Sequence, residues 1–196
     1  MITIKKTVRL VAAPEPPFVG TKIDILVPGD SRTFGIGSIY IADDASEFSI
    51  DWGDGSEPLR FSENASLVTH EYAAGGRYSV RISDGARSIS ISTSKTPGEY
   101  VTVYAPMIER VVSTAEKLTT ISSRAFKDCT ALTFVSFKSV SVLPAPNASN
   151  VQFIGCEALA AIHFAAENEE AIKATTGWAR SEGTLGAANA TIYFDL

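Results

Sequence analysis

This chain of 196 residues is poor in the side chains that most often carry out chemistry. It contains two cysteines and two histidines. Two cysteines are too few for a small domain held together by disulfides. Neither histidine has a serine or cysteine nucleophile nearby in a recognisable pattern, and the motif Gly-x-Ser-x-Gly does not occur. We therefore expect a protein that is not an enzyme, with no catalytic residues, no metal and no cofactor.

Positive charge and long apolar runs are also scarce. The net charge is −5, and Lys and Arg are scattered with no cluster longer than Lys5-Lys6. A nucleic acid or an anionic membrane would need a basic patch. No apolar run approaches the roughly 18 to 20 residues that cross a bilayer, and none follows the first lysines as in a secretory leader. We expect no nucleic-acid partner and no membrane insertion, whereas the oligomeric state is left open.

What the chain does contain favours β-structure. Val, Ile, Thr, Ser, Tyr and Phe dominate, helical stretches are almost absent before residue 165, and 45% hydrophobic content suffices for a core. Short alternating segments between Gly, Pro and Asp turns predict an all-β sandwich, in which Asp84-Gly85 forms a hairpin turn. The expected strands are residues 3–12, 22–27, 33–41, 47–52, 77–82 and 87–92.

The acids of the first half lie at turns. Asp51, Asp54 and Asp84 accompany glycines, as tight turns require, which favours a structural role over a catalytic carboxylate pair. A calcium site at Asp51 and Asp54 is the alternative, although it would need more oxygen ligands than the sequence offers. For His70 we expect a structural hydrogen bond.

Three motifs of the first half resemble the PKD family. They are Trp52-Gly53-Asp54-Gly55, His70-x-Tyr72 and Gly76-x-Tyr78-x-Val80, in that order. The resemblance covers roughly residues 20 to 93. It implies an immunoglobulin-like β-sandwich in which the tryptophan packs between the sheets and the Gly-Asp-Gly turn joins two strands.

The second half contains a repeat. Five apolar residues recur at an offset of 27 residues, which predicts a solenoid whose units stack to bury their apolar faces. The first copy is Phe126, Cys129, Leu132, Val135 and Phe137, and the second is Phe153, Cys156, Leu159, Ile162 and Phe164. Stacking brings the two cysteines close enough for a disulfide, and the alternative is a pair of buried thiols.

These units resemble the leucine-rich repeats of bacterial surface antigens, called BspA-like. Residues 121–132 fit the pattern Ile-x-x-x-Ala-Phe-x-x-Cys-x-x-Leu, whereas the second copy has Gln152 in place of the usual alanine. A degenerate unit precedes them at Ile108-x-x-Val111. A helix over 167–174, ended by Gly177-Trp178, and a strand over 187–194 are expected to cap the array. The predicted domains are a PKD-like β-sandwich at 1–97 and a BspA-like leucine-rich-repeat domain at 98–196, divided at Thr96-Pro97-Gly98.

The residues between the repeated ones should face outwards, because side chains alternate along a strand. An exposed aromatic flanked by Lys, His and Ser on a flat sheet suits a carbohydrate or protein contact, and the alternative is an ordinary solvated or interdomain face. The candidate ligand-binding residues are Arg110, Phe134, Ser136, Lys138 and His163, accompanied by Val112, Ala161 and Ala165.

Together these features predict a non-catalytic binding or adhesion module that recognises a protein or a surface glycan. By resemblance, such pairs of modules occur in bacterial surface adhesins and phage tail-associated proteins, so we expect an extracellular, cell-surface or virion-associated location. The alternatives are a structural spacer or oligomerising unit, and an accessory carbohydrate-binding region of a larger enzyme.

Overall fold

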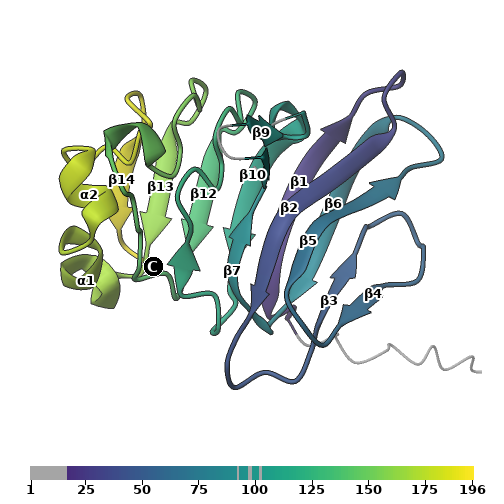
Figure 1. Cartoon of the computed structure of the whole chain (residues 1–196), viewed down its shortest axis with the longest axis horizontal. Helices are drawn as coiled ribbons and strands as arrows, with labels where there is room; N and C mark the ends of the chain where they lie inside the picture. The colour runs from purple at the N-terminus through teal and green to yellow at the C-terminus, as the bar shows by residue number, and fades with distance from the viewer. Residues whose placement is uncertain (1–16, 92, 97–98, 102) are drawn as a thin grey trace, which may run out of the picture.

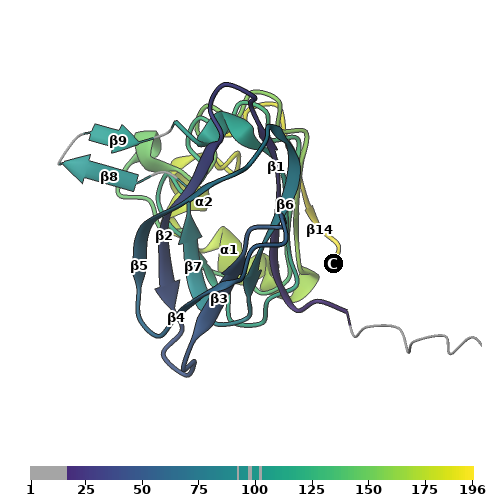
Figure 2. The ribbon, with the colours of Figure 1, turned by 90° about the vertical axis from the view of Figure 1, so that its right-hand side faces the viewer.

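The computed structural model describes residues 17–91, 93–96, 99–101 and 103–196. The chain is mainly β, as the sequence predicts, and its two larger sheets face each other across the core (Figures 1 and 2). The strands are β1 (Gly20–Val27), β2 (Thr33–Ile41), β3 (Phe48–Asp51), β4 (Leu59–Phe61), β5 (Ala65–Glu71), β6 (Gly76–Ser83), β7 (Ala86–Ser90), β8 (Thr93–Thr96), β9 (Glu99–Val101), β10 (Ile108–Ser113), β11 (Thr120–Ile121), β12 (Phe134–Phe137), β13 (Ala161–Phe164) and β14 (Thr191–Phe194).

The larger sheet has eight strands and contains both parallel and antiparallel pairs. Its order is β14-β13-β12-β10-β1-β6-β3-β4. Strands β10, β12, β13 and β14 run parallel to one another, whereas β1 is antiparallel to its neighbours β10 and β6. The second sheet has the order β11-β7-β2-β5, and β8 pairs with β9 alone. Among the described residues, no helix is long and apolar enough to span a membrane.

The larger sheet runs without a break from the first half of the chain into the second. Strand β1 hydrogen-bonds to β6 on one side and to β10 on the other, and β11 of the second half pairs with β7 of the first. One connected cluster of buried side chains extends from Ile23 to Ala187. The division into two domains remains a prediction, and Pro97 and Gly98 of the expected boundary lie outside the described residues.

Most of the expected strands occur where the alternation of the sequence places them. Strands β1, β2, β3, β6 and β7 overlap the predicted segments, whereas the strand expected at 3–12 lies outside the described residues. The sequence did not predict β4, and of β5 it singled out only the last residues. Both strands lie at sheet edges and are largely exposed, so they lack a clear apolar alternation.

The hairpin expected at Asp84-Gly85 does not form. Strand β6 belongs to the eight-stranded sheet and β7 to the other sheet, so this turn carries the chain across the core. The Asp84 carboxylate accepts a hydrogen bond from the Lys117 backbone N–H at 2.9 Å, and the Gly85 carbonyl accepts one from the Ala42 N–H at 2.9 Å. These contacts tie the turn to distant loops instead of closing a hairpin.

The repeated residues form the core of the second half. All five positions of both copies are at most 2% exposed. Val135 lies opposite Ile162 and Phe137 opposite Phe164 on adjacent parallel strands, so the offset of 27 residues is one step across the sheet. Phe126 and Phe153 stack with ring centroids 5.4 Å apart and planes within 7°. Strands β10 and β14 extend the same row by one strand on each side.

The two cysteines are free and buried. The Cys156 thiol donates to the Phe126 carbonyl, with a sulfur–oxygen distance of 3.0 Å. Burial, reinforced by Cys156, raises the pKa of the Cys129 thiol well above its usual value. Both cysteines therefore act in this structure as small packing residues of the stacked units.

Two short helices lie at the end of the larger sheet, beside β13 and β14 (Figure 1). Helix α1 spans Glu169–Lys173, and α2 spans Thr176–Arg180. The expected helix end at Gly177-Trp178 is wrong, because both residues lie within α2. The side chain of Thr175 accepts from the Trp178 N–H and so begins a new helix. A Cβ at Gly177 would come within 2.4 Å of the Leu143 carbonyl, so only glycine fits this approach.

Candidate functional site

Four side chains form a continuous stack on the outer face of strands β10, β12, β13 and β14. We call them the outer stack: Arg110, Phe134, His163 and Tyr193. The Arg110 guanidinium carbon lies 4.7 Å from the centre of the Phe134 ring. The rings of Phe134 and His163 are 5.1 Å apart, and those of His163 and Tyr193 are 4.5 Å apart with planes within 12°. Three of the five predicted binding residues are thus brought together on adjacent strands.

The other two predicted residues lie on the same face but outside the stack. Ser136 is opposite His163 in the sheet register and only 8% exposed, so its neighbours cover most of it. Lys138 is exposed and reaches Glu116, with 3.6 Å between Nζ and the nearest carboxylate oxygen. The prediction that Ala165 faces outwards is wrong, because this residue is only 1% exposed. Strand β13 ends at Phe164, so the alternation no longer applies there.

This face is completed by two residues that were not predicted from the sequence. Tyr193 lies opposite His163 in the register of β13 and β14, and Asp195 Oδ1 lies 2.8 Å from His163 Nδ1. A signal for them exists in the sequence. Ile-x-Phe at Ile162 and Phe164 recurs at Ile192 and Phe194, so the last strand is a further copy of the repeat strand. The 30-residue offset differs from 27 because the two short helices intervene.

A second histidine stack lies in the first half of the chain. The His70 ring is parallel to Trp52 at 5.1 Å, within 8°, and meets Tyr72 edge-on at 4.7 Å. Its Nε2 lies 2.7 Å from Asp54 Oδ2. The buried Tyr72 hydroxyl donates to the Trp52 carbonyl at 3.0 Å. His70 therefore has the structural hydrogen bond expected of it.

The polar groups around His70 form hydrogen bonds with one another. Burial alone would raise the pKa of Asp54, but hydrogen bonds from Ser56 and His70 outweigh it and lower this pKa to about 2. Burial raises the pKa of Tyr72, so its hydroxyl keeps the proton that it donates. Asp51 Oδ1 accepts from the Gly53 N–H at 2.9 Å. The turn acids thus satisfy nearby donors. In the described part of the chain no three His, Cys, Asp or Glu side chains gather as a metal ion would need.

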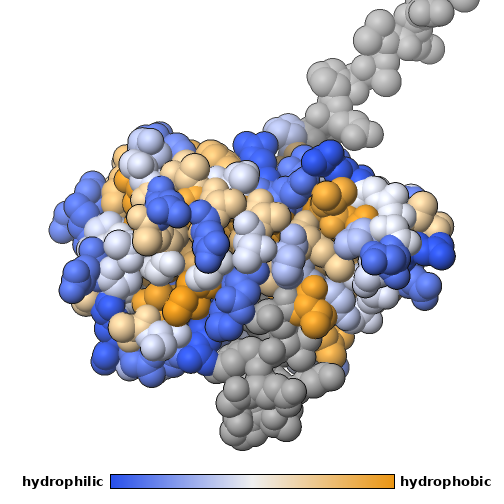
Figure 3. All heavy atoms as spheres, turned by 90° about the horizontal axis from the view of Figure 1, so that it is seen from above, coloured by the Kyte–Doolittle hydropathy of each residue, from blue (hydrophilic) through white to orange (hydrophobic). Residues whose placement is uncertain are grey.

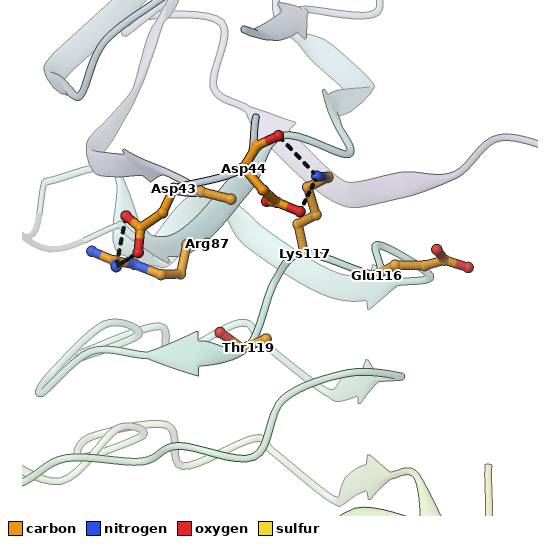
Figure 4. Close-up of a pocket in the computed structure, with 7 residues that line it drawn as sticks. Asp43, Asp44, Arg87, Glu116, Lys117 and Thr119 are labelled. Atoms are coloured by element: carbon orange, nitrogen blue, oxygen red, sulfur yellow. Dashed lines mark hydrogen bonds and ion pairs between the residues drawn. The ribbon is translucent and has the colours of Figure 1, made fainter. Parts of the chain in front are cut away.

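The surface also has several hollows of moderate size, and two of them illustrate what these offer a ligand. One, of about 370 Å³, lies where the two halves meet, and Figure 4 shows Arg87 and Lys117 each turned toward an aspartate there. Arg87 lies 3.2 Å from Asp43 and Lys117 2.7 Å from Asp44, so these opposite charges pair with each other. Exposed ion pairs of this kind contribute little free energy, and this hollow offers no cluster of unpaired charge.

The other hollow, of about 460 Å³, is more apolar. It lies at the end of β1, and its lining includes Leu26, Pro28, Val103, Pro106 and Met107. The molecule seen from above has apolar residues in separate patches among polar ones (Figure 3). Among the residues that the structure describes, the one polar side chain that lines this hollow is Glu109, and Arg77 holds it in two hydrogen bonds of 2.9 and 3.0 Å. The described lining therefore offers few polar groups that would orient a ligand.

No known family model matches this chain, and neither does any curated protein or solved structure. The candidate site thus stands on its geometry alone. Of the surfaces described, the outer stack is the one that combines accessible aromatic rings with charged groups on a rigid sheet.

Proposed function

We propose that this protein is a non-catalytic recognition module of a bacterial cell surface or a phage particle. The outer stack would contact the protein or glycan that it recognises. The observation that carries the proposal is the unbroken row Arg110–Phe134–His163–Tyr193 on four hydrogen-bonded strands.

The finer architecture belongs to the same proposal. We infer a PKD-like, immunoglobulin-like sandwich followed by a short BspA-like leucine-rich-repeat solenoid. The sandwich is supported by Trp52, which is 1% exposed between the sheets, and by the pairing of β3 with β4 across the Gly-Asp-Gly turn. The solenoid is supported by the in-register stacking of the repeated residues.

A row of rings on a sheet suits recognition for energetic reasons. Aromatic side chains supply a large contact area, and little conformational entropy is lost because they have few rotatable bonds. Each ring of the outer stack is already held by its neighbours, and His163 is held further by Asp195. A ligand would therefore meet a preorganised surface, which lowers the cost of binding.

The experiment compares the wild-type chain with Phe134→Ala on arrays of surface glycans and of surface proteins. Phe134→Ala should abolish selective binding, because it removes the first ring of the outer stack and the support of Arg110. Tyr40→Ala is the matched control, since Tyr40 is 43% exposed on the other sheet. Binding that survives Phe134→Ala unchanged would overturn the proposal.

A structural spacer or oligomerising unit is the second candidate. It is favoured by the two edges of the eight-stranded sheet, β14 and β4, whose outer sides pair with no described strand. This function predicts no ligand on either array and a defined oligomer by light scattering. A polysaccharide ligand would instead fit either the adhesion module or an accessory region of a larger enzyme.

A further inference from the structure

Each aromatic stack of this sheet has a cation over the ring at one of its ends. On the inner face, Phe137, Phe164 and Phe194 form a row, and Lys173 Nζ lies 5.5 Å from the centre of the last ring. On the outer face, the stack begins with the Arg110 guanidinium over Phe134. A cation of the chain itself therefore covers the terminal ring at the β14 end of the inner row and at the β10 end of the outer stack.

The β14 end of the outer stack is open. Tyr193 rests one face on His163 and is 41% exposed. Within the part of the chain that the structure describes, no ring or cation lies on its other face. This open ring belongs to the edge strand of the sheet, so no described strand shields it.

A carboxylate lies one ring further into the stack, at His163. The contact of Asp195 with His163 places this carboxylate on the outer face, and the Asp195 side chain is 50% exposed. Oδ1 is engaged by His163 at 2.8 Å, whereas no described residue hydrogen-bonds to Oδ2. The β14 end of the outer stack thus has an open π-face on Tyr193, and an accessible acceptor that carries negative charge lies at the next ring, His163.

We propose that this open face of Tyr193, together with Asp195, receives an arginine side chain of a partner protein. The inference rests on the proposed function and names the partner chemistry of the same surface. A guanidinium is planar and always charged, stacks on aromatic rings and forms hydrogen bonds to a carboxylate from its edge. It would complete the outer stack as Arg110 does at the opposite end. The net charge of −5 also favours a basic partner over an anionic one.

The test is an NMR titration of the whole chain with Nα-acetyl-arginine amide. Resonances of the Tyr193 and His163 rings should shift and saturate at roughly millimolar concentrations, as a single small cation site allows. The citrulline analogue has the same shape without the charge, and it should bind at least about fivefold more weakly. Added salt should weaken the arginine amide and leave the citrulline analogue unchanged.

Three variants locate the site. Tyr193→Ala should abolish the shift of the His163 ring, whereas Tyr193→Phe keeps the π-face and should bind within about threefold of the wild type. Asp195→Asn removes the charge and should weaken binding about threefold or more. Tyr40→Ala, on the other sheet, should change nothing. The spectrum of each variant reports in the same experiment whether it is folded.

Equal binding of the arginine and citrulline amides would overturn this inference, as would tighter binding of a methyl hexoside at the same ring. Insensitivity of the arginine amide to Tyr193→Ala would overturn it as well. These failures are distinct from failure of the proposed function. If Phe134→Ala abolishes recognition on the arrays while the arginine amide does not bind, the inference is wrong and the proposed function stands. If recognition ignores Phe134→Ala, the proposed function is wrong, even where arginine binding supports the cation site.

Discussion

The two histidines of this protein have nearly the same immediate surroundings. His70 is parallel to Trp52 and 2.7 Å from Asp54, and His163 is parallel to Tyr193 and 2.8 Å from Asp195. The two histidine side chains are also equally accessible, at 18% and 19%. The local chemistry does not distinguish them.

What differs is the ring under each histidine. Trp52 is 1% exposed between the two sheets, whereas Tyr193 is 41% exposed on the edge strand. The Asp54 side chain is 18% exposed, against 50% for Asp195. In the first arrangement the supporting ring is buried, so we expect its contribution to be to stability. The second has an accessible ring and acceptor, so the same three groups become available to a partner.

The largest expected effect is on stability. Trp52→Ala should lower the free energy of unfolding by about 3 to 5 kcal/mol, because it removes a fully buried ring and leaves a cavity. Tyr193→Ala should cost less than about 1 kcal/mol, since that ring is already largely in water. Urea unfolding of both variants measures the two losses in free energy of unfolding. Equal losses would contradict the conclusion that the ring under His70 is buried and the ring under His163 is exposed.

Tyr72→Phe tests the hydrogen bond that joins the first arrangement to the chain. We expect a loss of about 1 to 2 kcal/mol, because the buried Trp52 carbonyl loses the hydroxyl that donates to it at 3.0 Å. Tyr193→Phe is the matched control, since the hydroxyl of that exposed tyrosine has water as an alternative partner. Thermal or urea unfolding would reveal a wrong assignment if both variants lost the same amount.

Asp54 gives the first arrangement a dependence on pH. Its pKa is about 2 in the folded protein and 3.8 ordinarily, so the folded state favours the charged form. The stability that this provides is present above pH 3.8 and is lost as the pH falls toward 2. We expect about 1 kcal/mol, because solvent screens part of the interaction. The difference in free energy of unfolding between the wild type and Asp54→Asn should therefore become smaller as the pH falls from 3.8 toward 2. If that difference stays constant, Asp54 is not the source of the pH dependence.

Asp195→Asn should have the smallest effect on stability, below about 0.5 kcal/mol, because its half-exposed pairing with His163 competes with water. The same substitution should weaken binding of the arginine amide. A loss of stability as large as that of Tyr72→Phe would show that the outer arrangement is structural, like the inner one.

Much of this architecture could be predicted from local sequence patterns. Alternation located strands β1, β2, β3 and β6, and the repeat placed Val135 and Phe137 in the core. The same alternation predicted that Arg110, Phe134 and His163 share the outer face. These features depend on the two-residue period of a strand and on stacking between sequence copies, both of which are written in the order of the residues.

Other features depend on contacts between distant segments. The pairing of β1 with β10, and the passage of Asp84-Gly85 from one sheet to the other, follow from which strand edges meet across the core. Alternation indicates which side of a strand is buried, but not which strand will lie beside it. Tyr193 and Asp195 were missed because the copy of the repeat strand at Ile192 and Phe194 is short, and it is the pairing of β14 with β13 that brings them to His163.

The sequence by itself therefore determined the β class, the repeating core and most of the outer stack, because each follows from periodicity along the chain. The tertiary structure decided that the two halves share one sheet and that the outer stack ends at an uncovered ring. Both depend on where a sheet edge finds a neighbour, and that is a property of the folded chain as a whole.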